Sequence, residues 1–348
     1  MKKILLWLVI VATIVAISFV GTACTVDTST AAETTASEAT VENSEAAETT
    51  ASEAVAEEKL VFGETNPMQD EWWISNVNGA KDYCAANGIE LNVMNTAKPQ
   101  DALEQINHID EMITNEVDAI LVIVSDGDLL ADSVKKANAA GIPIGTSGAE
   151  INLPRFGEND VDVRIIGSNY EPAKKYALYI AELLGGKGDV VSMSGVPGIA
   201  VSDDRERGIQ EGFKEGGLTL LDSQPAQWDP DKSYQLMSDY LTKFPKIDAV
   251  FGCYGGGTLA AYQAAKAVGR EKEMLFFAWD GSKSVLEAMA RGEIAGDVDM
   301  NPYNMGWLMA SGLHRAAAYP KFQRSITQVE FRIITPDNLA KYYPELAQ

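Results

Sequence analysis

The sequence predicts an α/β protein of two similar, doubly wound lobes, each built on a parallel sheet. From residue 59 onward, short apolar runs alternate with amphipathic stretches of helix length, the pattern of parallel strands joined by helices. Residues 59–348 are too many for one small unit of this kind, which favours two lobes. The segment 117–137 also recurs 130 positions later, at 247–267, with strand, glycine-bearing loop and helix in the same order. The two lobes are therefore expected to be alike.

Ten apolar runs are the expected strands, because each is short and bounded by polar or glycine-containing segments. In chain order they cover residues 59–63, 89–94, 119–124, 142–146, 163–166, 189–193, 218–221, 249–253, 274–278 and 294–299. Stretches between them are amphipathic with a helical period, which predicts helices with one buried face. These helices are expected at residues 128–140, 171–184, 203–215, 232–243 and 258–268.

Residues 1–23 have the pattern of a secretory signal peptide. Lys2 and Lys3 precede a 17-residue apolar run, Ile4–Val20, and small residues follow. Because Cys24 comes next, the segment resembles the signal of a bacterial lipoprotein, in which cleavage exposes a cysteine that receives lipid. We therefore expect Cys24 to be lipidated and to anchor the chain to a membrane. A permanent signal anchor is the alternative, since the apolar run approaches the length that spans a bilayer.

Residues 24–58 are expected to be the lipidated cysteine followed by a disordered tether. The tether consists almost entirely of Thr, Ser, Ala and Glu, and the string AAETTASEA occurs at 31–39 and again at 46–54. Such a composition cannot bury enough apolar surface to offset the entropy of ordering, although transient helix is possible. The signal carries +2 and the tether −9, so residues 59–348 keep −15 of the total −22. That charge disfavours nucleic acid as a partner, because it repels phosphate.

The chemistry-bearing residues disfavour an enzyme, a cofactor and a metal site. The chain has three cysteines and two histidines, too few for a disulfide scaffold or a Cys/His zinc site. We expect Cys84 and Cys253 to be buried free thiols, and His108 and His314 to be surface or packing residues. The glycines within 252–257 match no phosphate-binding loop and are expected to form a tight turn. An α/β enzyme remains the alternative of a different class, because such folds host many enzymes.

A ligand site is expected beyond the carboxyl ends of the strands, where open α/β sheets bind their ligands. Four of the six tryptophans fall at predicted strand-to-helix junctions: Trp72, Trp73, Trp228 and Trp279. Any one of them could pack in the core, but four together favour a binding site. Flat aromatic faces beside Asp, Asn and Arg suit a sugar ring, and aromatic faces near carboxylates also suit an organic cation.

Eight short motifs, in this order and spacing, carry a family resemblance. They are NPMQDEWW (66–73), VDAILVIVSD (117–126), KKANAAGIPI (135–144), GSN (167–169), SDDRERG (202–208), SQPAQW (223–228), IDAVFGCY (247–254) and FAWDG (277–281). Through them, residues 59–335 resemble the type I periplasmic solute-binding proteins of ABC importers, in the ribose- and galactose-binding branch. The resemblance implies two Rossmann-like lobes joined by a three-segment hinge near residues 167–170, 299–302 and 330–335. It assigns residues 59–167 and 301–330 to the N-terminal lobe, and residues 168–300 and 331–348 to the C-terminal lobe.

The resemblance also implies roles for individual residues. Trp72 and Trp73 from one lobe and Trp228 from the other would sandwich a ring, while Arg205 and Asp280 would hydrogen-bond to its rim. Arg207 is the alternative to Arg205. The full expected ligand-binding set is Asn66, Asp70, Trp72, Trp73, Asn169, Arg205, Trp228, Tyr254, Trp279, Asp280 and Met300.

The sequence departs from the family pattern at several positions that usually recognise hydroxyl groups. Ile123, Gly148, Ala149, Tyr254 and Met300 stand where polar or charged residues are common in the family. Ribose and galactose are therefore poor candidates. A larger, less hydroxylated or partly cationic solute fits the remaining aromatic and carboxylate groups better.

The function implied by the resemblance is that of an extracytoplasmic substrate-binding lipoprotein of an ABC importer. It would capture a sugar or sugar-like solute by hinge closure, as a monomer, and deliver it to a membrane permease without chemistry. The lipid anchor would hold it on the extracytoplasmic face of the cell membrane, at the cell surface or in the periplasm. A binding protein that signals to a chemoreceptor or histidine kinase is the alternative, and an enzyme is a more distant one.

Overall fold

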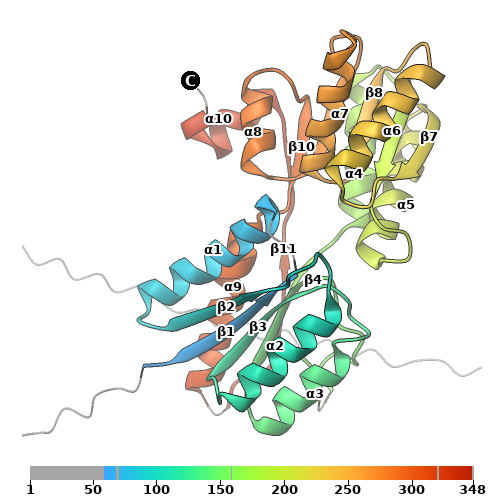
Figure 1. Cartoon of the computed structure of the whole chain (residues 1–348). Helices are drawn as coiled ribbons and strands as arrows, with labels where there is room; N and C mark the ends of the chain where they lie inside the picture. The colour runs from blue at the N-terminus through green and yellow to red at the C-terminus, as the bar shows by residue number, and fades with distance from the viewer. Residues whose placement is uncertain (1–58, 68–69, 158, 320, 347–348) are drawn as a thin grey trace, which may run out of the picture. The chain divides into compact units, whose positions relative to one another are not determined.

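The computed structural model describes residues 59–67, 70–157, 159–319 and 321–346. The predicted signal peptide, Cys24 and the tether lie outside these residues. Within the described ranges, no helix combines the length and apolar character needed to cross a membrane. The described chain forms two six-stranded sheets, each with helices on both faces (Figure 1).

The first sheet has the strand order β11-β5-β4-β3-β1-β2, and all of its neighbouring strands are parallel. Its strands are β1 (Val61–Asn66), β2 (Glu90–Asn95), β3 (Ala119–Val124), β4 (Ile144–Gly148), β5 (Val163–Gly167) and β11 (Ser325–Val329). Its helices are α1 (Glu71–Ala86), α2 (Ala102–Thr114), α3 (Ala131–Ala140) and α9 (Pro302–Ala318). Alternate residues of β3 pack toward α1 and α9 on one face and toward α2 and α3 on the other. The unbroken apolar run AILVIV therefore belongs to a strand buried on both faces.

The second sheet has the strand order β12-β10-β9-β8-β6-β7 and is parallel except for the antiparallel pair β10 and β12. Its strands are β6 (Asp189–Ser194), β7 (Thr219–Pro225), β8 (Ala249–Gly252), β9 (Leu275–Asp280), β10 (Gly296–Asp299) and β12 (Arg332–Ile334). Its helices are α4 (Tyr170–Leu183), α5 (Ala200–Glu215), α6 (Pro230–Lys243), α7 (Gly255–Ala267), α8 (Lys283–Ala290) and α10 (Pro336–Tyr342), followed by the 3₁₀ turn η1 (Pro344–Leu346). One core lies under α4 and α5, and the other under α6, α7, α8 and α10.

The internal repeat is confirmed by the topology of the sheets. β3 lies between β4 and β1 in the first sheet, and β8 lies between β9 and β6 in the second. The helices that follow these strands, α3 and α7, complete the pair of segments that recur 130 positions apart. Two parallel α/β lobes of one design are therefore present, as the sequence predicts.

The chain passes between the two sheets three times. It crosses after β5 into α4, after β10 into α9, and between β11 and β12 (Figure 1). As a result, α9 and β11 pack with the first sheet although they follow β6 to β10 of the second sheet in sequence. The predicted three-segment connection is thus confirmed.

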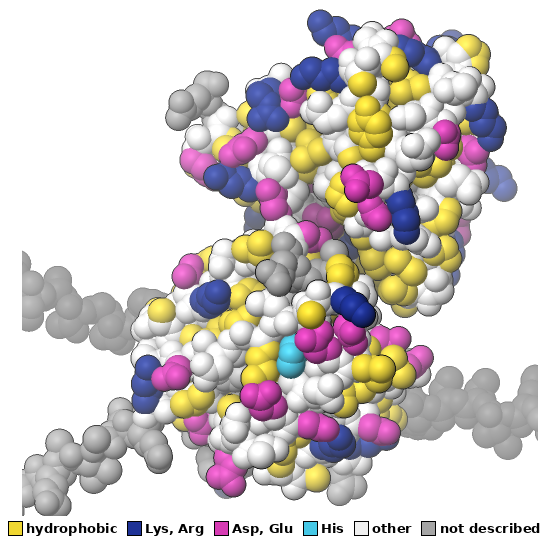
Figure 2. Space-filling view, in the orientation of Figure 1, with side chains coloured by type: hydrophobic (Ala, Val, Ile, Leu, Met, Phe, Trp, Pro, Cys, Tyr) yellow, Lys and Arg dark blue, Asp and Glu magenta, His cyan; other side chains and the backbone are white. Residues whose placement is uncertain are grey.

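Charged side chains of both signs are interspersed over the face of the molecule shown in Figure 2. Several form exposed ion pairs, such as Lys136 with Asp110 at 2.8 Å and Lys174 with Glu215 at 2.9 Å. Exposed pairs of this kind contribute little to stability. The surface charge therefore bears on solubility and steering rather than on the fold.

Candidate functional site: a pocket between the two sheets

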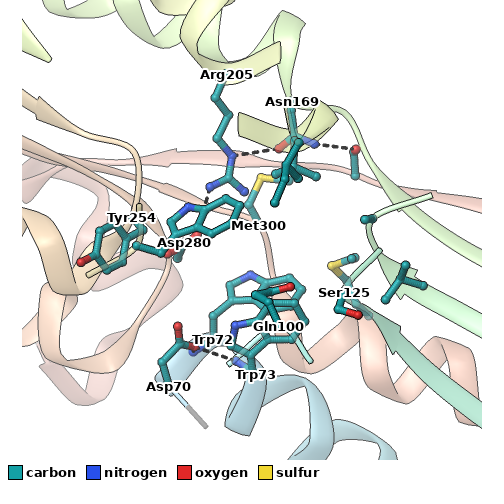
Figure 3. Close-up of a pocket in the computed structure, with 18 residues that line it drawn as sticks. Asp70, Trp72, Trp73, Gln100, Ser125, Asn169, Arg205, Tyr254, Asp280 and Met300 are labelled. Carbon is teal, nitrogen blue, oxygen red and sulfur yellow. Dashed lines mark hydrogen bonds and ion pairs between the residues drawn. The ribbon is translucent and has the colours of Figure 1, made fainter. Parts of the chain in front are cut away.

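A pocket that opens to solvent is lined by residues that follow strands of both sheets (Figure 3). Its walls come from loops and helix starts at the carboxyl ends of the strands, as expected for an open α/β fold. The lining residues are Asp70, Trp72, Trp73, Gln100, Val124, Ser125, Gly148, Ala149, Gly167, Asn169, Ile199, Val201, Arg205, Trp228, Tyr254, Asp280, Met300 and Met305.

The start of α1 places two tryptophans in the pocket. Asp70 is the N-cap of this helix, and its Oδ1 accepts hydrogen bonds from the backbone N–H groups of Trp72 at 3.1 Å and Trp73 at 3.2 Å. The two indole rings meet edge to face, with centroids 4.7 Å apart and planes at 77°. One carboxylate thus fixes the helix start that carries two aromatic faces, and burial raises the pKa of that carboxyl.

Trp228 approaches the pocket from the second sheet, in the loop between β7 and α6. Its φ is +54° and that of Gln227 is +57°, so two consecutive non-glycine residues adopt the left-handed conformation. Gly195 lies directly behind the indole, because a Cβ there would sit 2.9 Å from two of its ring carbons. The position of Trp228 therefore depends on a strained turn and on a glycine at residue 195.

Arg205, on α5, has four protein contacts at the pocket wall. Its Nε donates to Asn169 Oδ1 at 2.9 Å and its Nη1 donates to the Cys253 carbonyl at 2.8 Å. Nη1 lies 3.6 Å from Asp280 Oδ1, and the guanidinium stacks on the Trp279 ring at 4.7 Å. These contacts fix the planar group at the pocket wall.

Asp280, the last residue of β9, has a φ of +115°, which turns its carboxylate into the pocket. Its Oδ2 accepts a hydrogen bond from the Gly255 N–H at 3.2 Å, at the start of α7. The pKa of this carboxyl is raised to about 7, mainly by burial and in smaller part by the negative charge of Asp70, although the positive charge of Arg205 lowers it. Asp280 is therefore a titratable group near neutral pH.

Tyr254 is the N-cap residue of α7 and precedes a glycine cluster. We expected these glycines to form a tight turn, but Gly255, Gly256 and Gly257 form the first turn of α7. A Cβ at Gly257 would lie 2.3 Å from the Tyr254 ring, and one at Gly255 would lie 2.5 Å from the Ser282 hydroxyl. Glycine is needed at these positions because neighbouring side chains leave no space for a Cβ, and not because the backbone forms a tight turn there.

Two predicted ligand contacts do not line the pocket. Trp279 is fully buried within β9, where its ring faces Tyr176 and Phe251 and supports Arg205 from behind. Asn66, at the end of β1, is buried and donates from Nδ2 to the side chain of Asn95. The other nine residues of the predicted set line the pocket together. Arg207 points elsewhere, to Asp204 and the Tyr170 ring, so Arg205 is the arginine at this wall.

Several lining residues escape the sequence reasoning. Gln100 follows β2, a strand end to which the rule that ligands bind after strand ends was not applied. Ser125 follows β3 within the motif VDAILVIVSD, at a strand end where ligand contacts are expected, but it is not in the predicted ligand-binding set. Ser125 donates its hydroxyl to the buried Gln105 at 2.6 Å. The apolar residues Ile199, Val201 and Met305 carry no sequence signal, since nothing distinguishes them from core residues.

Both histidines contact hydroxyl groups outside the pocket. His108 Nδ1 lies 3.0 Å from the Thr65 hydroxyl and His314 Nδ1 lies 3.0 Å from the Tyr83 hydroxyl. Cys84, in α1, and Cys253, just after β8, are buried free thiols, and burial raises the pKa of each to about 12. In the part of the chain that the structure describes, no group of three or more His, Cys, Asp or Glu is arranged to hold a metal ion.

The sequence of the chain is similar to those of two named solute-binding proteins. The chain is 24% identical over 261 residues to the ribose import binding protein of Bacillus subtilis (strain 168), covering 75% of this chain and 82% of that protein. It is 30% identical over 220 residues to the xylitol-binding protein of Mycolicibacterium smegmatis, covering 63% of this chain and 61% of that protein.

Solved structures share the fold. An ABC transporter periplasmic solute-binding protein from Actinobacillus succinogenes 130z with bound D-allose superimposes with a TM-score of 0.76 at 21% identity, over 82% of this chain and 100% of that one. A solute-binding protein from Bacillus halodurans C-125 with bound myo-inositol gives a TM-score of 0.75 at 23% identity, over 82% and 98%. The sequence model of the periplasmic binding protein domain matches residues 65–320. The chain therefore belongs to the periplasmic binding protein family.

Proposed function

We propose that the chain is the extracytoplasmic solute-binding protein of an ABC importer and captures a sugar or sugar-like solute between its two sheets. One observation carries this function: tryptophans from both sheets line one pocket with Arg205 and Asp280. A sugar ring stacks its C–H face on aromatic rings and directs its hydroxyl rim to charged and amide groups. The relatives support the proposal, since their names describe binding of ribose and xylitol and two solved structures hold allose and inositol.

The function is capture and release, without chemistry. Residues 59–167 with 301–330 act as one lobe, and residues 168–300 with 331–348 act as the other. The three crossings serve as the hinge. Trp72 and Trp73 approach the ligand from the first lobe and Trp228 from the second, so the full contact forms only when the lobes close. The closed form docks on a membrane permease and releases its solute there.

Lipid on Cys24 anchors the protein, and residues 25–58 allow the binding unit to reach the permease as a monomer. The anchor can be tested apart from binding. Cells that express the chain are grown with a clickable fatty acid, and the same is done for Cys24→Ser. Label should appear on the first protein and be lost from the second, which should leave the membrane fraction. Label that persists in Cys24→Ser contradicts the anchor.

The binding function is tested by identifying what the purified protein carries. Native mass spectrometry of the protein from its own host should reveal a small solute, and a thermal-shift library should name its class. We expect a sugar or sugar-like solute to raise the melting temperature and to be recovered unchanged. Failure of every solute to bind, or turnover of the bound solute, would contradict the proposal.

A further inference from the structure

We propose that the solute carries a protonated amine on its ring, and that Asp70 and Asp280 bind this amine. This inference names the substrate class of the pocket and rests on the proposed function. It begins with the charges on the pocket wall. Two carboxylates, Asp70 and Asp280, and one guanidinium, Arg205, line the pocket. With its acids ionised, the empty site has an excess of negative charge that a neutral sugar would leave uncompensated.

Arg205 forms an ion pair with only one of the two acids, Asp280. It bonds to Asn169 and to the Cys253 carbonyl and lies 3.6 Å from Asp280 Oδ1. Its guanidinium face rests on Trp279, which is itself fully buried. These contacts hold the guanidinium beside Asp280. The positive charge of Arg205 therefore serves Asp280 and not Asp70.

Asp70 has no positively charged partner among the described residues. Its Oδ1 caps α1 through the Trp72 and Trp73 N–H groups, and no lysine or arginine of the described chain forms an ion pair with it. Figure 3 shows Asp70 and Asp280 at the same end of the pocket, Asp70 beside α1 and Asp280 on the opposite sheet. The charge of Asp70 raises the pKa of Asp280, so the two carboxylates repel each other across this space. A cation placed between them would relieve that repulsion.

The apolar part of the pocket wall also favours a solute with an amine group over a solute that carries only hydroxyl groups. Val124, Ile199, Val201, Met300 and Met305 give apolar surface where polar partners for hydroxyls would be needed. The faces of tryptophan rings attract cations through the ring quadrupole, most strongly when water is excluded. Three tryptophans around two carboxylates therefore form a site suited to a ring that bears positive charge.

Matched pairs of ligands test this inference. Calorimetry is run with glucosamine, galactosamine and the imino sugar deoxynojirimycin, each beside a neutral counterpart: glucose, galactose and anhydroglucitol. We expect at least one amine to bind, and to bind on the order of tenfold to a hundredfold more tightly than its neutral partner, the range for a charge-assisted hydrogen bond. If no amine binds, or if the neutral partners bind as tightly, the inference is wrong.

A variant separates charge from shape. Asp70→Asn keeps an N-cap side chain and the volume of the wall but removes the charge. The amine should lose about tenfold or more in affinity relative to its neutral partner, so that the preference for the amine shrinks. Asp101→Asn, which caps α2 and does not itself line this pocket, should alter neither affinity. Tight binding of neutral sugars that is indifferent to Asp70→Asn would reject the amine and leave the proposed sugar-binding function standing. Failure of both amines and neutral solutes would reject both.

Discussion

Trp228 and Asp280 both reach the pocket from backbone conformations that non-glycine residues rarely adopt. Their φ values are +54° and +115°, and Asn301 at the crossing into α9 has a φ of +50°. Such residues cost of order 1–3 kcal/mol each and persist where the surrounding structure holds them. Here they aim one aromatic face and one carboxylate at the same cavity. Two of the strained residues, Trp228 and Asp280, therefore lie in the candidate binding pocket.

Trp228→Ala should weaken solute binding strongly. Loss of stacking and burial of an indole corresponds to about 2–4 kcal/mol of binding free energy. Calorimetry of the identified solute measures this directly. Unchanged affinity would remove Trp228 from the site.

Gly195→Ala should weaken binding without removing any ligand contact. The new methyl group would lie 2.9 Å from the Trp228 ring and would displace it. We expect an intermediate loss of affinity and a changed tryptophan fluorescence spectrum, with a nearly normal melting temperature. Normal affinity together with a normal spectrum would show that the loop accommodates the methyl group.

Glu64 is a buried acid in the middle of β1, and neither of its carboxylate oxygens has a hydrogen-bond partner among the described residues. Burial raises its pKa from 4.5 to about 8. The folded state therefore keeps a proton that the unfolded chain releases, so this group lowers stability as pH rises from about 4.5 to about 8. Glu64→Gln should raise the free energy of unfolding by a few kcal/mol near pH 8 and by little near pH 4. Urea unfolding at both pH values tests this, and an equal effect at both would contradict it.

At the scale of elements, helix starts carry most of the site. Asp70, Asn169, Val201 and Tyr254 lie in or just before the first turns of α1, α4, α5 and α7.

A hydrogen-bonded contact between two helix starts joins α1, which packs on the first sheet, to α8, which packs on the second. Glu71, in the first turn of α1, accepts hydrogen bonds from the Ser284 N–H at 3.0 Å and the Ser284 hydroxyl at 2.8 Å, at the start of α8.

Glu71→Gln should speed release of the solute. The carboxylate binds the positive end of α8, and the amide would keep the shape but lose the charge. We expect the dissociation rate to rise about three- to tenfold, as for loss of roughly 1 kcal/mol. Stopped-flow fluorescence measures the rate, with Glu90→Gln, whose exposed partner is Lys59, as the control. An unchanged rate would show that this contact does not hold the lobes together.

The sequence predicts the strands well because most are buried on both faces and appear as unbroken apolar runs. β11 and β12 escape it, since Ser325–Val329 is mixed in polarity and Arg332–Ile334 is three residues long. Trp279 shows why contacts are harder to predict than elements. Side chains alternate along a strand, so Trp279 joins the core under α4 and α5 while its neighbour Asp280 faces the pocket. A position at a strand end does not reveal on which face a side chain lies.

At the scale of the whole molecule, the two lobes share one titrating site. Asp280 from β9 faces Arg205 from α5, Asp70 ahead of α1, the Gly255 N–H of α7, and Asp297 of β10. Because the pKa of Asp280 is about 7, an amine ligand should bind more tightly as pH rises toward 7 and ionises this carboxyl, and should bind more weakly again at higher pH, where the amine itself loses its proton. A neutral ligand should not follow this profile. Calorimetry between about pH 5.5 and 8.5 makes the comparison, and a flat profile for the amine would contradict the pairing.

The three crossings between the sheets also govern the order in which the protein can fold. The core of the first sheet contains Met305, Met309 and Leu313 of α9, and its edge strand is β11. A ribosome makes these residues only after the whole of β6 to β10, so the first lobe cannot close its core early in synthesis. The N-terminal half of the chain must wait, incompletely folded, for a segment near the other end. For a polypeptide that has to thread through a narrow translocation channel before it folds, late closure keeps it in a form that can pass.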